Sequence, residues 1–320
     1  MRVLVTGANG FIGKHLCHFL LENGFSVVGG VRSRRGLREL PGGVAGVMVG
    51  DVGPHTDWGE ALTGVDAVVH LAARVHVMKE RSQNPLTAFR EVNVEGTRRL
   101  AEKAVSKGVS RLVFLSSVGV NGEETGESPF SEQDPPQPYS PYTGSKWEAE
   151  QVLGALGSDA GKLSVVVLRL PMVYGPGGVG NVARLLAWVD RGVPLPLASV
   201  RNQRSFLYVG NLVHAIRHCL EHPMAANQTF LVSDGEDVST PELIRGLGQA
   251  LNRPVRLVPV SQVILRAVGR ATGKGKDVQR LVGSLTVRTD KIHRLTGWTP
   301  PFVFKEGISE TARWYKDSRK

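Results

Sequence analysis

The stretch RVLVTGANGFIGKHLCHFLLENG, residues 2–24, decides the fold of this chain. A short apolar run meets a turn that holds Gly7, Gly10 and Gly13, and a helix-length segment then ends at Gly24, a natural residue just beyond a helix. Glycines at such a turn allow a tight bend, close approach of a pyrophosphate and close packing of helix on sheet. The helix N-terminus offers N–H groups and a positive dipole end, so the stretch predicts a dinucleotide site.

Further apolar runs follow through the first half of the chain, and each is apolar on successive residues, as strands buried on both faces must be. They cover residues 25–31, 46–50, 66–72, 111–116 and 164–170. Helix-length stretches separate these runs. This alternation predicts right-handed βαβ crossovers and an α/β fold with a doubly wound parallel sheet, the Rossmann fold.

The alternation of apolar runs and helix-length stretches ends after Leu170, where residues 171–181 are rich in Gly and Pro. Two later pieces, 204–221 and 229–233, read as a helix and a strand that return to the sheet. We therefore expect an NAD(P)-binding Rossmann domain over residues 1–174, to which 204–233 return. A smaller C-terminal α/β substrate lobe is expected over 175–203 and 234–320.

The composition of the chain bears on its partners, on membrane insertion and on the use of its cysteines. The chain has 320 residues and a net charge of +10, which favours an anionic partner. Its basic residues are scattered and accompany no nucleic-acid-binding signature, so we expect a phosphate-bearing small molecule and no nucleic acid. No apolar run reaches the ~20 residues of a membrane span, and no signal peptide is recognisable. Cys17 and Cys219 are too few for a disulfide framework or metal cluster, so a cytoplasmic protein without a metal is expected.

The end of the second strand bears on the cofactor. An Asp or Glu there would bind a ribose 2′-hydroxyl and repel a 2′-phosphate. This chain instead has Arg32, Arg34 and Arg35, with no acid until Glu39. Three guanidiniums can pair with a phosphate, which favours NADP(H), with NAD(H) as the alternative. A solvated basic loop is the competing interpretation. Asp51, after the third strand, can meet the adenine edge or be a surface turn residue.

A second motif is SPYTGSKWEAE, residues 140–150. Ser140 is a good N-cap and Pro141 suits the first helical position, so Tyr142 and Lys146 share one helix face. If no other motif is considered, the favoured interpretation is a solvent-exposed contact between Tyr142 and Lys146. The run LVFLSSVGV, residues 112–120, places Ser117 at the end of the fifth strand.

The glycine loop, the strand-end Ser and Tyr-x-x-x-Lys, in this order, closely resemble the extended short-chain dehydrogenase/reductases. Within that superfamily the chain resembles the NAD(P)-dependent nucleotide-sugar epimerase, dehydratase and ketoreductase branch. The resemblance implies that Tyr142 is the acid/base, Lys146 its activator and ribose ligand, and Ser117 the hydrogen-bond partner of the reacting oxygen. The chemistry agrees, because an ammonium beside a phenol of pKa ~10 favours the phenolate.

The resemblance also implies further binding residues. Arg204 would bind the nucleotide diphosphate with help from Asn181, which could equally be a helix N-cap, and Ser117 and Val118 would contact the sugar. Asn93 would support Lys146, or else be an ordinary polar helix residue. His76 is expected to be a loop residue that can line the sugar pocket. The cofactor-binding residues would be Gly7, Asn9, Gly10, Phe11, Ile12, Gly13, Arg32, Arg34, Arg35, Asp51, Val52, Leu71, Ala72, Ala73, Asn93, Tyr142 and Lys146.

Several residues that differ from the family's patterns reduce the number of reactions that the chain is expected to catalyse. Val118 and Gly119 follow Ser117 where 4,6-dehydratases have an Asp-Glu pair, so dehydration is not expected. Arg32 and Met172 stand where UDP-glucose 4-epimerases usually have an acid and an Asn. We therefore expect a 4-ketoreductase of a UDP-4-keto-(6-deoxy)-hexose or N-acetylhexosamine. The alternative is a UDP-glucose or UDP-N-acetylglucosamine 4-epimerase with tightly bound NAD. More distant alternatives are a hydroxysteroid- or flavonoid-type ketone reductase and a non-catalytic binding module, which the intact Tyr and Lys disfavour.

The family pairs two subunits through helices that here fall at residues 86–107 and 142–154, which implies a homodimer. Both segments have spare apolar positions, and two helices from each subunit make a self-complementary patch. If every apolar residue faced its own chain, a monomer would result. The candidate positions are Leu86, Phe89, Val92, Leu100, Trp147 and Val152.

Overall fold

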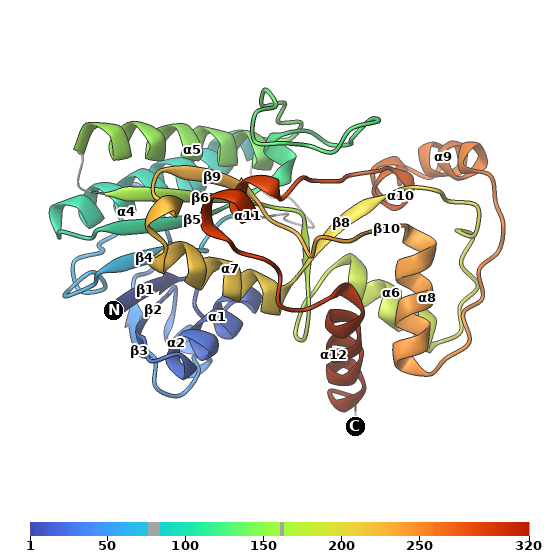
Figure 1. Ribbon diagram of the computed structural model, residues 1–320, viewed down its shortest axis with the longest axis horizontal. Coiled ribbons are helices and arrows are strands. Elements are labelled where there is room, and N and C mark those ends of the chain that lie inside the picture. Colours follow the sequence, from blue (N-terminus) through green and yellow to red (C-terminus); the bar gives the residue numbers. More distant parts are fainter. Residues whose placement is uncertain (76–83, 161–162, 320) are drawn as a thin grey trace.

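The first strand of the chain lies third from one edge of a seven-stranded sheet in which all pairings are parallel (Figure 1). The structure, a computed structural model, describes residues 1–75, 84–160 and 163–319, so that His76 lies outside the described residues. The strands in spatial order are β3 (Ala45–Met48), β2 (Ser26–Val31), β1 (Arg2–Thr6), β4 (Ala67–His70), β5 (Arg111–Ser117), β6 (Ser164–Leu170) and β9 (Gln228–Leu231).

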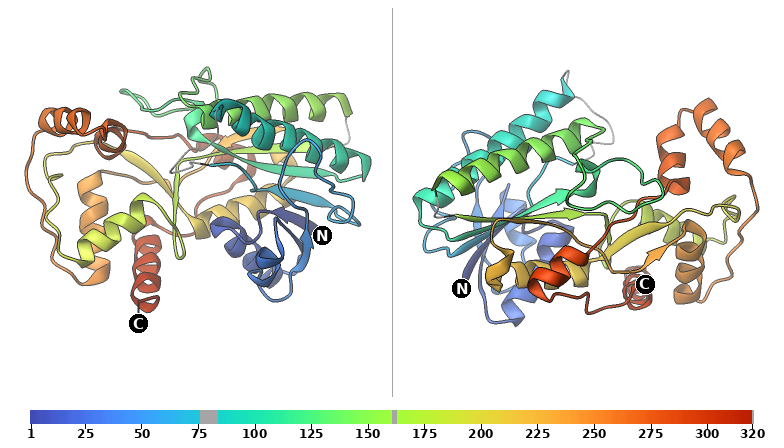
Figure 2. Two further views of the ribbon diagram at one scale, coloured as in Figure 1. Left: turned by 180° about the vertical axis from the view of Figure 1, so that it is seen from behind. Right: turned by 45° about the horizontal axis from the view of Figure 1, so that its top comes forward.

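Helices cover both faces of this sheet, as Figures 1 and 2 show. One face packs against α1 (Phe11–Glu22) and α7 (Val209–Glu221), and the other against α4 (Gly96–Ser106) and α5 (Pro141–Ala160). The central strands are therefore buried on both sides, with Val3, Leu4 and Val5 fully inaccessible. This is the doubly wound fold that the successive apolar runs predict. The edge strand β3 differs from that prediction, because most of its residues are exposed.

Short elements connect the layers of the large sheet. They are α2 (Arg34–Arg38), α3 (Pro85–Arg90), the π-helical turn η1 (Glu91–Glu95), the 3₁₀ turns η2 (Val118–Val120) and η3 (Pro223–Ala225), and α11 (Asp290–Thr296). Helix α3 runs through η1 into α4, and π turns of this kind are frequent at functional sites.

A second, three-stranded sheet lies beside the carboxyl ends of the large sheet's strands and has a core of its own. Its strands are β7 (Met172–Tyr174), β8 (Arg204–Tyr208) and β10 (Asp237–Val238), with β8 in the middle. Around it pack α6 (Asn181–Asp190), α8 (Thr240–Leu251), α9 (Gln262–Ala271), α10 (Gly275–Val282) and α12 (Phe304–Asp317). Figure 1 shows this lobe on the side away from the N-terminus.

Two strands correct the domain boundaries expected from sequence. Residues 204–208 were expected to begin a helix of the Rossmann domain, but they form β8 and pair with β7 and β10 in the small sheet. Strand β7 also lies in the small sheet, although residues 172–174 fall inside the expected 1–174 domain. The reason is hydrogen bonding: a short buried strand needs partners for its backbone, and only the sheet that surrounds it supplies them. Of the segment 204–233 that was expected to return to the Rossmann domain, α7 packs on the large sheet and β9 pairs within it.

Other expectations concern membrane and metal. Within the described ranges no helix is long and apolar enough to cross a bilayer. Among the same residues no group of three or more His, Cys, Asp or Glu side chains is arranged to hold a metal ion. Cys17 and Cys219 are buried in the core beside β1 and β5, and burial raises the pKa of each thiol to about 12, which makes both unreactive.

Candidate active site

The glycine loop between β1 and α1 has the geometry of a phosphate cradle. Gly7 has φ +66° and its N–H donates to the Gly30 carbonyl, while the Gly10 N–H donates back to the Gly7 carbonyl. A Cβ on Gly13 would come 2.3 Å from the Gly7 oxygen, so helix and loop touch backbone to backbone. No side chain caps α1 at Gly10, which leaves the positive helix end open to an anion. These residues fit the diphosphate of a dinucleotide.

The first turns of α1 connect this loop to the segment that leads into the smaller lobe. Ile12 packs against the main core. Phe11 contacts the lobe: a Cβ on Gly178 would lie 3.2 Å from its ring. His15, one turn later, hydrogen-bonds through Nε2 to the Pro176 carbonyl at 2.7 Å. The cofactor loop and the loop that borders the substrate cavity are thus in direct contact.

The basic run after β2 forms the start of α2, and its arginines are exposed. Arg32 Nε lies 3.7 Å from Asp51, and Arg35 donates to Glu39 at 2.9 Å. Glu39 also accepts from the Asn9 side chain of the glycine loop at 3.1 Å. The hydrogen bonds from Asn9 and Arg35 lower the pKa of Glu39. Sequence reasoning missed this acid because α2 folds back and brings it to the loop from eight residues beyond the strand.

The loop after β4 is tied to β1 by a buried network around His70. The Leu71 and Ala72 N–H groups both donate to Thr6 Oγ1, whose own proton goes to His70 Nδ1 at 2.8 Å. Thr97 donates to the Asn93 carbonyl, so its oxygen accepts from His70 Nε2 at 3.0 Å. This pattern requires a neutral ring. Burial first, and then the charge on Lys146, lowers the pKa of His70 to about 3.

Asn93 lies in the π turn η1, and its side chain links the loop at Arg74 to helix α5 at Ser145. Its side chain exchanges two hydrogen bonds with the Arg74 backbone, at 2.8 and 3.0 Å. It also donates to Ser145 Oγ at 2.9 Å, on the helix that carries Lys146. Val52, another predicted cofactor residue, packs on Gly96 at the start of α4, and Ala73 lies half-buried in the same loop as Arg74.

Helix α5 begins at Pro141, as the sequence predicts, and carries Tyr142 and Lys146 on one face. Ser140 Oγ accepts from the Thr143 N–H at 3.2 Å, the capping bond expected of an N-cap. The Tyr142 ring is half-buried against Phe89, with ring centroids 6.2 Å apart. Lys146 is 3% exposed, and its ammonium donates to the Leu115 carbonyl at 2.8 Å and lies 4.4 Å from the centre of the Phe114 ring.

Burial moves both side chains toward their neutral forms. It lowers the pKa of Lys146 from 10.5 to about 7, against the opposing pull of the Glu150 carboxylate. It raises the pKa of Tyr142 from 10.0 to about 12, and nearby Tyr139 acts in the same direction. Both groups are thus held where charge is poorly solvated, as is common for groups at functional sites.

Ser117 reaches the same place from the end of β5. Its Oγ accepts from the Gly119 N–H at 3.1 Å and caps the 3₁₀ turn η2. A Cβ on Gly119 would lie 2.4 Å from the Thr143 side chain and 3.3 Å from Ser117 Oγ. Only a glycine at 119 allows the serine loop to pack directly on the first turn of α5. Ser117, Tyr142 and Lys146 are therefore gathered at one edge of the sheet.

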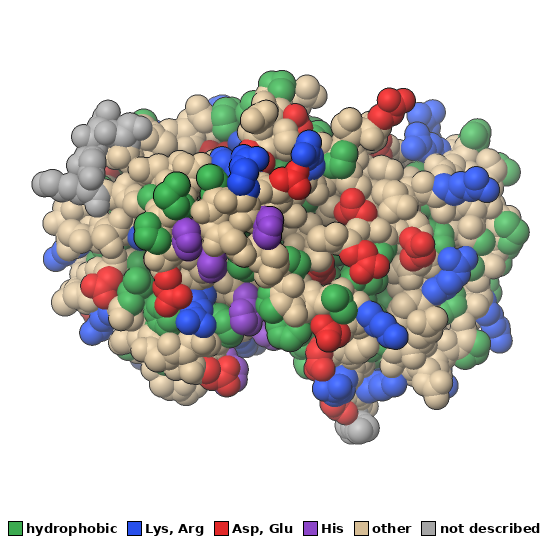
Figure 3. Space-filling model, viewed as in Figure 1, with side chains coloured by type: hydrophobic (Ala, Val, Ile, Leu, Met, Phe, Trp, Pro, Cys, Tyr) green, Lys and Arg blue, Asp and Glu red, His purple; other side chains and the backbone are tan. Residues whose placement is uncertain are grey.

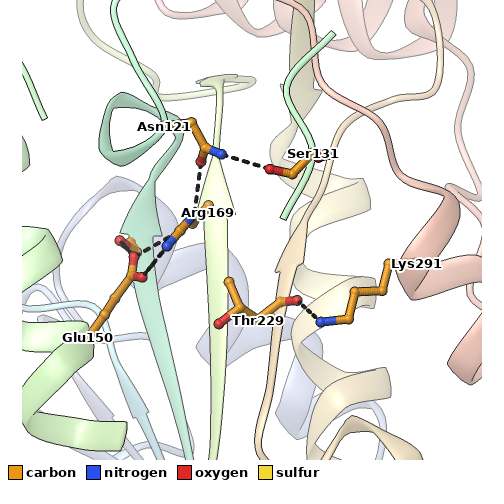
Figure 4. Close-up of polar contacts among 7 residues, drawn as sticks. Asn121, Ser131, Glu150, Arg169, Thr229 and Lys291 are labelled. Atoms are coloured by element: carbon orange, nitrogen blue, oxygen red, sulfur yellow. Dashed lines mark hydrogen bonds and ion pairs between the residues drawn. The ribbon is translucent and has the colours of Figure 1, made fainter. Parts of the chain in front are cut away.

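A buried ion pair, drawn in Figure 4, lies one turn beyond Lys146. Glu150 holds Arg169 of β6 with bonds of 2.7 and 3.2 Å and accepts from Ser116, and both charged side chains are about 5% exposed or less. Arg169 also donates to Asn121 at 3.1 Å, which in turn donates to the Ser131 carbonyl. The network fixes β5, β6 and α5 relative to one another, which also fixes Lys146.

A cavity of about 720 Å³ opens next to this edge and lies between the sheet and the substrate lobe. All four residues predicted to contact substrate line it: Ser117, Val118, Asn181 and Arg204. Asn181 begins α6, after Gly180 with φ +101°, so it is also the first residue of a helix. Tyr139 lines the cavity just before α5, and sequence reasoning did not single it out.

Arg204 has charged neighbours that sequence could not connect. Its guanidinium donates to the Gly283 carbonyl at 2.9 Å, and burial lowers its pKa while Glu124 opposes that shift. Arg280 of α10 lines the same cavity and adds a second positive charge close enough to affect Arg204. Glu124 hydrogen-bonds Gln279, also on α10. Arg204 and Arg280 thus bring two guanidiniums that can pair with a diphosphate to a cavity that Glu123, Glu124 and Asp277 also line. No motif surrounds Arg280, so only the fold could reveal it.

Comparisons with known proteins agree with this geometry. Residues 3–233 match the model of the NAD dependent epimerase/dehydratase family. A UDP-glucose 4-epimerase of Vibrio cholerae is 42% identical over 97% of this chain and 94% of its own length. The structure of MoeE5 in complex with UDP-glucuronic acid and NAD is 27% identical, with TM-score 0.80 over 99% of this chain and 100% of that one. The Thermus thermophilus UDP-glucose 4-epimerase, solved with NAD, is 28% identical, with TM-score 0.77 over 99% of both chains. This chain is an enzyme of the NAD dependent epimerase/dehydratase family.

Proposed function

We propose that this enzyme is a UDP-sugar 4-epimerase, which inverts the configuration at C4 of a UDP-hexose or UDP-N-acetylhexosamine. The observation that carries the proposal is the 42% identity, over nearly the whole chain, to a relative named as a UDP-glucose 4-epimerase. The cavity is compatible with the proposal, because Arg204 and Arg280 line it together with Ser117. The 4-ketoreductase expected from sequence has no such support among these relatives. The proposal therefore adopts the alternative reaction.

Three residues would have separate roles in the proposed reaction. The Tyr142 phenolate would take the proton of the sugar 4-hydroxyl as C4 is oxidised and return it as C4 is reduced. Ser117 Oγ would hydrogen-bond the same oxygen, and the Lys146 ammonium would stabilise the phenolate through the buried medium. Bound NAD, held along the glycine loop, would supply the hydride acceptor at C4 and a positive ring charge that favours the phenolate.

Inversion requires the 4-keto sugar to present its opposite face before reduction. Arg204 and Arg280 would hold the diphosphate at one end of the cavity, far along the molecule from C4. The sugar could then turn about the bonds that join it to the diphosphate while the nucleotide stays fixed. The cavity volume of about 720 Å³ lies within the usual range of small-molecule pockets.

We also propose NAD as the resident cofactor, in place of the NADP favoured by sequence. Glu39 accepts a hydrogen bond from the glycine-loop Asn9, which places a negative charge beside this loop that would repel a 2′-phosphate. Two of the three arginines expected to bind a 2′-phosphate face carboxylates instead, Arg35 with Glu39 and Arg32 with Asp51. An epimerase that returns its hydride in each cycle also has no need to exchange its cofactor.

The decisive experiment combines extraction and turnover. The nucleotide that co-purifies with the protein is released by heat and identified by mass, and UDP-glucose is supplied without added cofactor. We expect NAD in the extract and formation of UDP-galactose, or of the corresponding N-acetylated pair. Consumption of added NADPH with a 4-keto-UDP-sugar, and no interconversion of epimers, would establish the ketoreductase instead.

A further inference from the structure

A surface at the far end of the substrate lobe takes no part in the proposed reaction. It lies on α9 and is formed by Val263, Ile264, Ala267, Val268 and Ala271, which we call the α9 face. At 100° per residue these five positions fall within about 140° of arc, so they make one stripe. All five are exposed, with Val263 at 75%, Ile264 at 55% and Val268 at 55%. Exposed apolar residues are common singly, but a continuous stripe usually marks a binding surface.

The stripe is exposed although the rest of α9 is well packed. Leu265 turns inward against the core of the lobe. A Cβ on Gly269 would lie 2.7 Å from Val278, so α9 and α10 pack closely against each other. Ser261 caps the start of α9 by accepting from the Val263 N–H at 3.3 Å. The helix is therefore held in a fixed orientation that directs its apolar stripe to the outside.

The charge around the stripe is strongly one-sided. Residues 243–276 contain no Asp or Glu, while the whole chain has a net charge of +10. Their positive residues are Arg245, Arg253, Arg256, Arg266, Arg270, Lys274 and Lys276, seven in all. Arg266 and Arg270 lie one turn apart along the edge of the α9 face, and Lys274 and Lys276 follow in the turn to α10. In Figure 3, hydrophobic and basic side chains lie side by side over the end of the molecule where Figure 1 places α9 and α10.

We propose that the α9 face docks on the surface of an anionic phospholipid bilayer. Apolar side chains flanked by Arg and Lys are the composition of helices that lie in the membrane interface, with the apolar side in the acyl boundary and the cations among the headgroups. Anionic lipid complements this charge, and each nearby Lys or Arg strengthens the attraction. A second copy of the chain would bring like charges together at the same surface, and nucleic acid would leave the apolar stripe unused.

Docking in this way would bring the active site close to the bilayer. The α9–α10 hairpin is continuous with the cavity wall, because Asp277, Gln279 and Arg280 of α10 all line the cavity. Helix α9 itself contributes none of the residues that line it. Membrane binding and turnover of a water-soluble sugar nucleotide can therefore be tested separately, and the docking proposal does not depend on the identity of the sugar.

The test is flotation of the full-length protein with vesicles of phosphatidylcholine alone or of phosphatidylcholine and phosphatidylglycerol in equal parts. We expect binding to the anionic vesicles, with loss on going from about 0.1 M to about 1 M salt, over which the Debye length falls from about 10 Å to about 3 Å. The pair R266Q and R270Q should lower the partition coefficient by about 30-fold, roughly fivefold for each charge. The set V263S, I264S and V268S should lower it by about tenfold or more.

Matched controls are Met224→Ser, an exposed apolar residue (57%) in η3, and Arg294→Gln, an exposed arginine in α11. Both should float like the wild type, and all variants should retain wild-type turnover of UDP-sugar, which excludes misfolding. The proposal is overturned if the wild type does not bind anionic vesicles, or if it binds neutral ones equally well. It is also overturned if the α9 variants float unchanged, or if they change the oligomeric state without changing flotation.

Discussion

At the scale of single residues, the pKa values of the proposed acid/base pair, Tyr142 and Lys146, depend mainly on burial. Lys146 is directed at the Leu115 carbonyl and the Phe114 ring, and its low pKa comes from desolvation. The buried Glu150–Arg169 pair lies next to it and satisfies its own charges. The Glu150 carboxylate opposes the effect of burial on the Lys146 pKa but does not outweigh it.

Tyr142→Phe tests the acid/base directly. The ring still packs against Phe89, and only the proton-transferring oxygen is lost, so the fold and cofactor binding should persist. We expect turnover to fall by about 10²–10⁴-fold, the usual contribution of general acid–base catalysis. Steady-state rates and the melting temperature provide the readouts. A variant that retains most of its activity would remove Tyr142 from the mechanism.

Lys146→Met tests the burial of the ammonium through pH. The unfolded chain keeps this proton up to about pH 10.5, whereas the folded protein releases it near pH 7. Between these values the unfolded state binds more protons, so the wild type gains stability as pH rises from 7 to 10.5. The Met variant should lack this gain and be relatively most stable at or below pH 7. Urea unfolding of both cofactor-free proteins across that range measures the difference, and parallel curves would contradict the low pKa.

At the scale of elements, the site is built where glycines allow two segments to approach closely. The β1–α1 loop contacts α1 at Gly13, and the serine loop contacts α5 at Gly119. In both places a side chain would separate two elements whose spacing sets the geometry of the site. Glycine is needed there for close approach, which is a different requirement from the positive φ of Gly7.

Gly13→Ala should therefore disrupt cofactor binding. Its Cβ would lie 2.3 Å from the Gly7 oxygen and 2.7 Å from the Ala8 oxygen, and backbone cannot move aside as a flexible side chain can. We expect a loss of nucleotide from the purified protein and a lower melting temperature. Gly246→Ala in α8 is the control, because its Cβ would meet only Ile308, at 4.0 Å, and alanine favours a helix. Equal behaviour of the two variants would argue against a tight loop.

Glu39→Gln tests how α2 selects the cofactor. Removal of the carboxylate should weaken NAD binding and improve NADP binding, since the repulsion of a 2′-phosphate disappears while the arginines remain. Competitive binding of both dinucleotides to nucleotide-stripped protein measures the ratio. The companion variant with Arg32, Arg34 and Arg35 replaced by Gln gives the opposite test. The proposal of NAD is wrong if the wild type prefers NADP and the triple arginine variant, but not Glu39→Gln, loses affinity for NADP. The three arginines would then bind the 2′-phosphate, as the sequence indicates.

At the scale of the whole molecule, the homodimer stays a prediction that the structure makes more specific. Phe89 and Leu100 are buried within their own chain and are not available to a partner. Leu86 is 38% exposed, and Val92, Trp147 and Val152 are half-buried on the α3–α5 side. We expect light scattering to give twice the 34.6 kDa of one chain. Val152→Asp should shift the mass toward the monomer while Met224→Asp should not, and a monomeric wild type would refute the dimer.

The sequence by itself determined the large sheet and indicated the proposed catalytic residues Ser117, Tyr142 and Lys146. Successive apolar runs predict strands buried on both faces, and local signals such as Ser140, Pro141 and Gly24 mark where helices begin and end. Tyr142 and Lys146 share a helix face at any i, i+4 spacing, so their proximity needs no tertiary information. Ser117 joins them because parallel strands end at one edge of the sheet.

Tertiary structure alone decided the rest, because the remaining contacts join segments far apart in the chain. Residues 204–208 form a strand only because β7 and β10 lie on either side of them. Glu39 reaches Asn9 only after α2 folds back, and Arg280 approaches Arg204 only through the placement of α10. The values of the Lys146 and Tyr142 pKa likewise follow from burial, which is a property of the packed molecule and of no single motif.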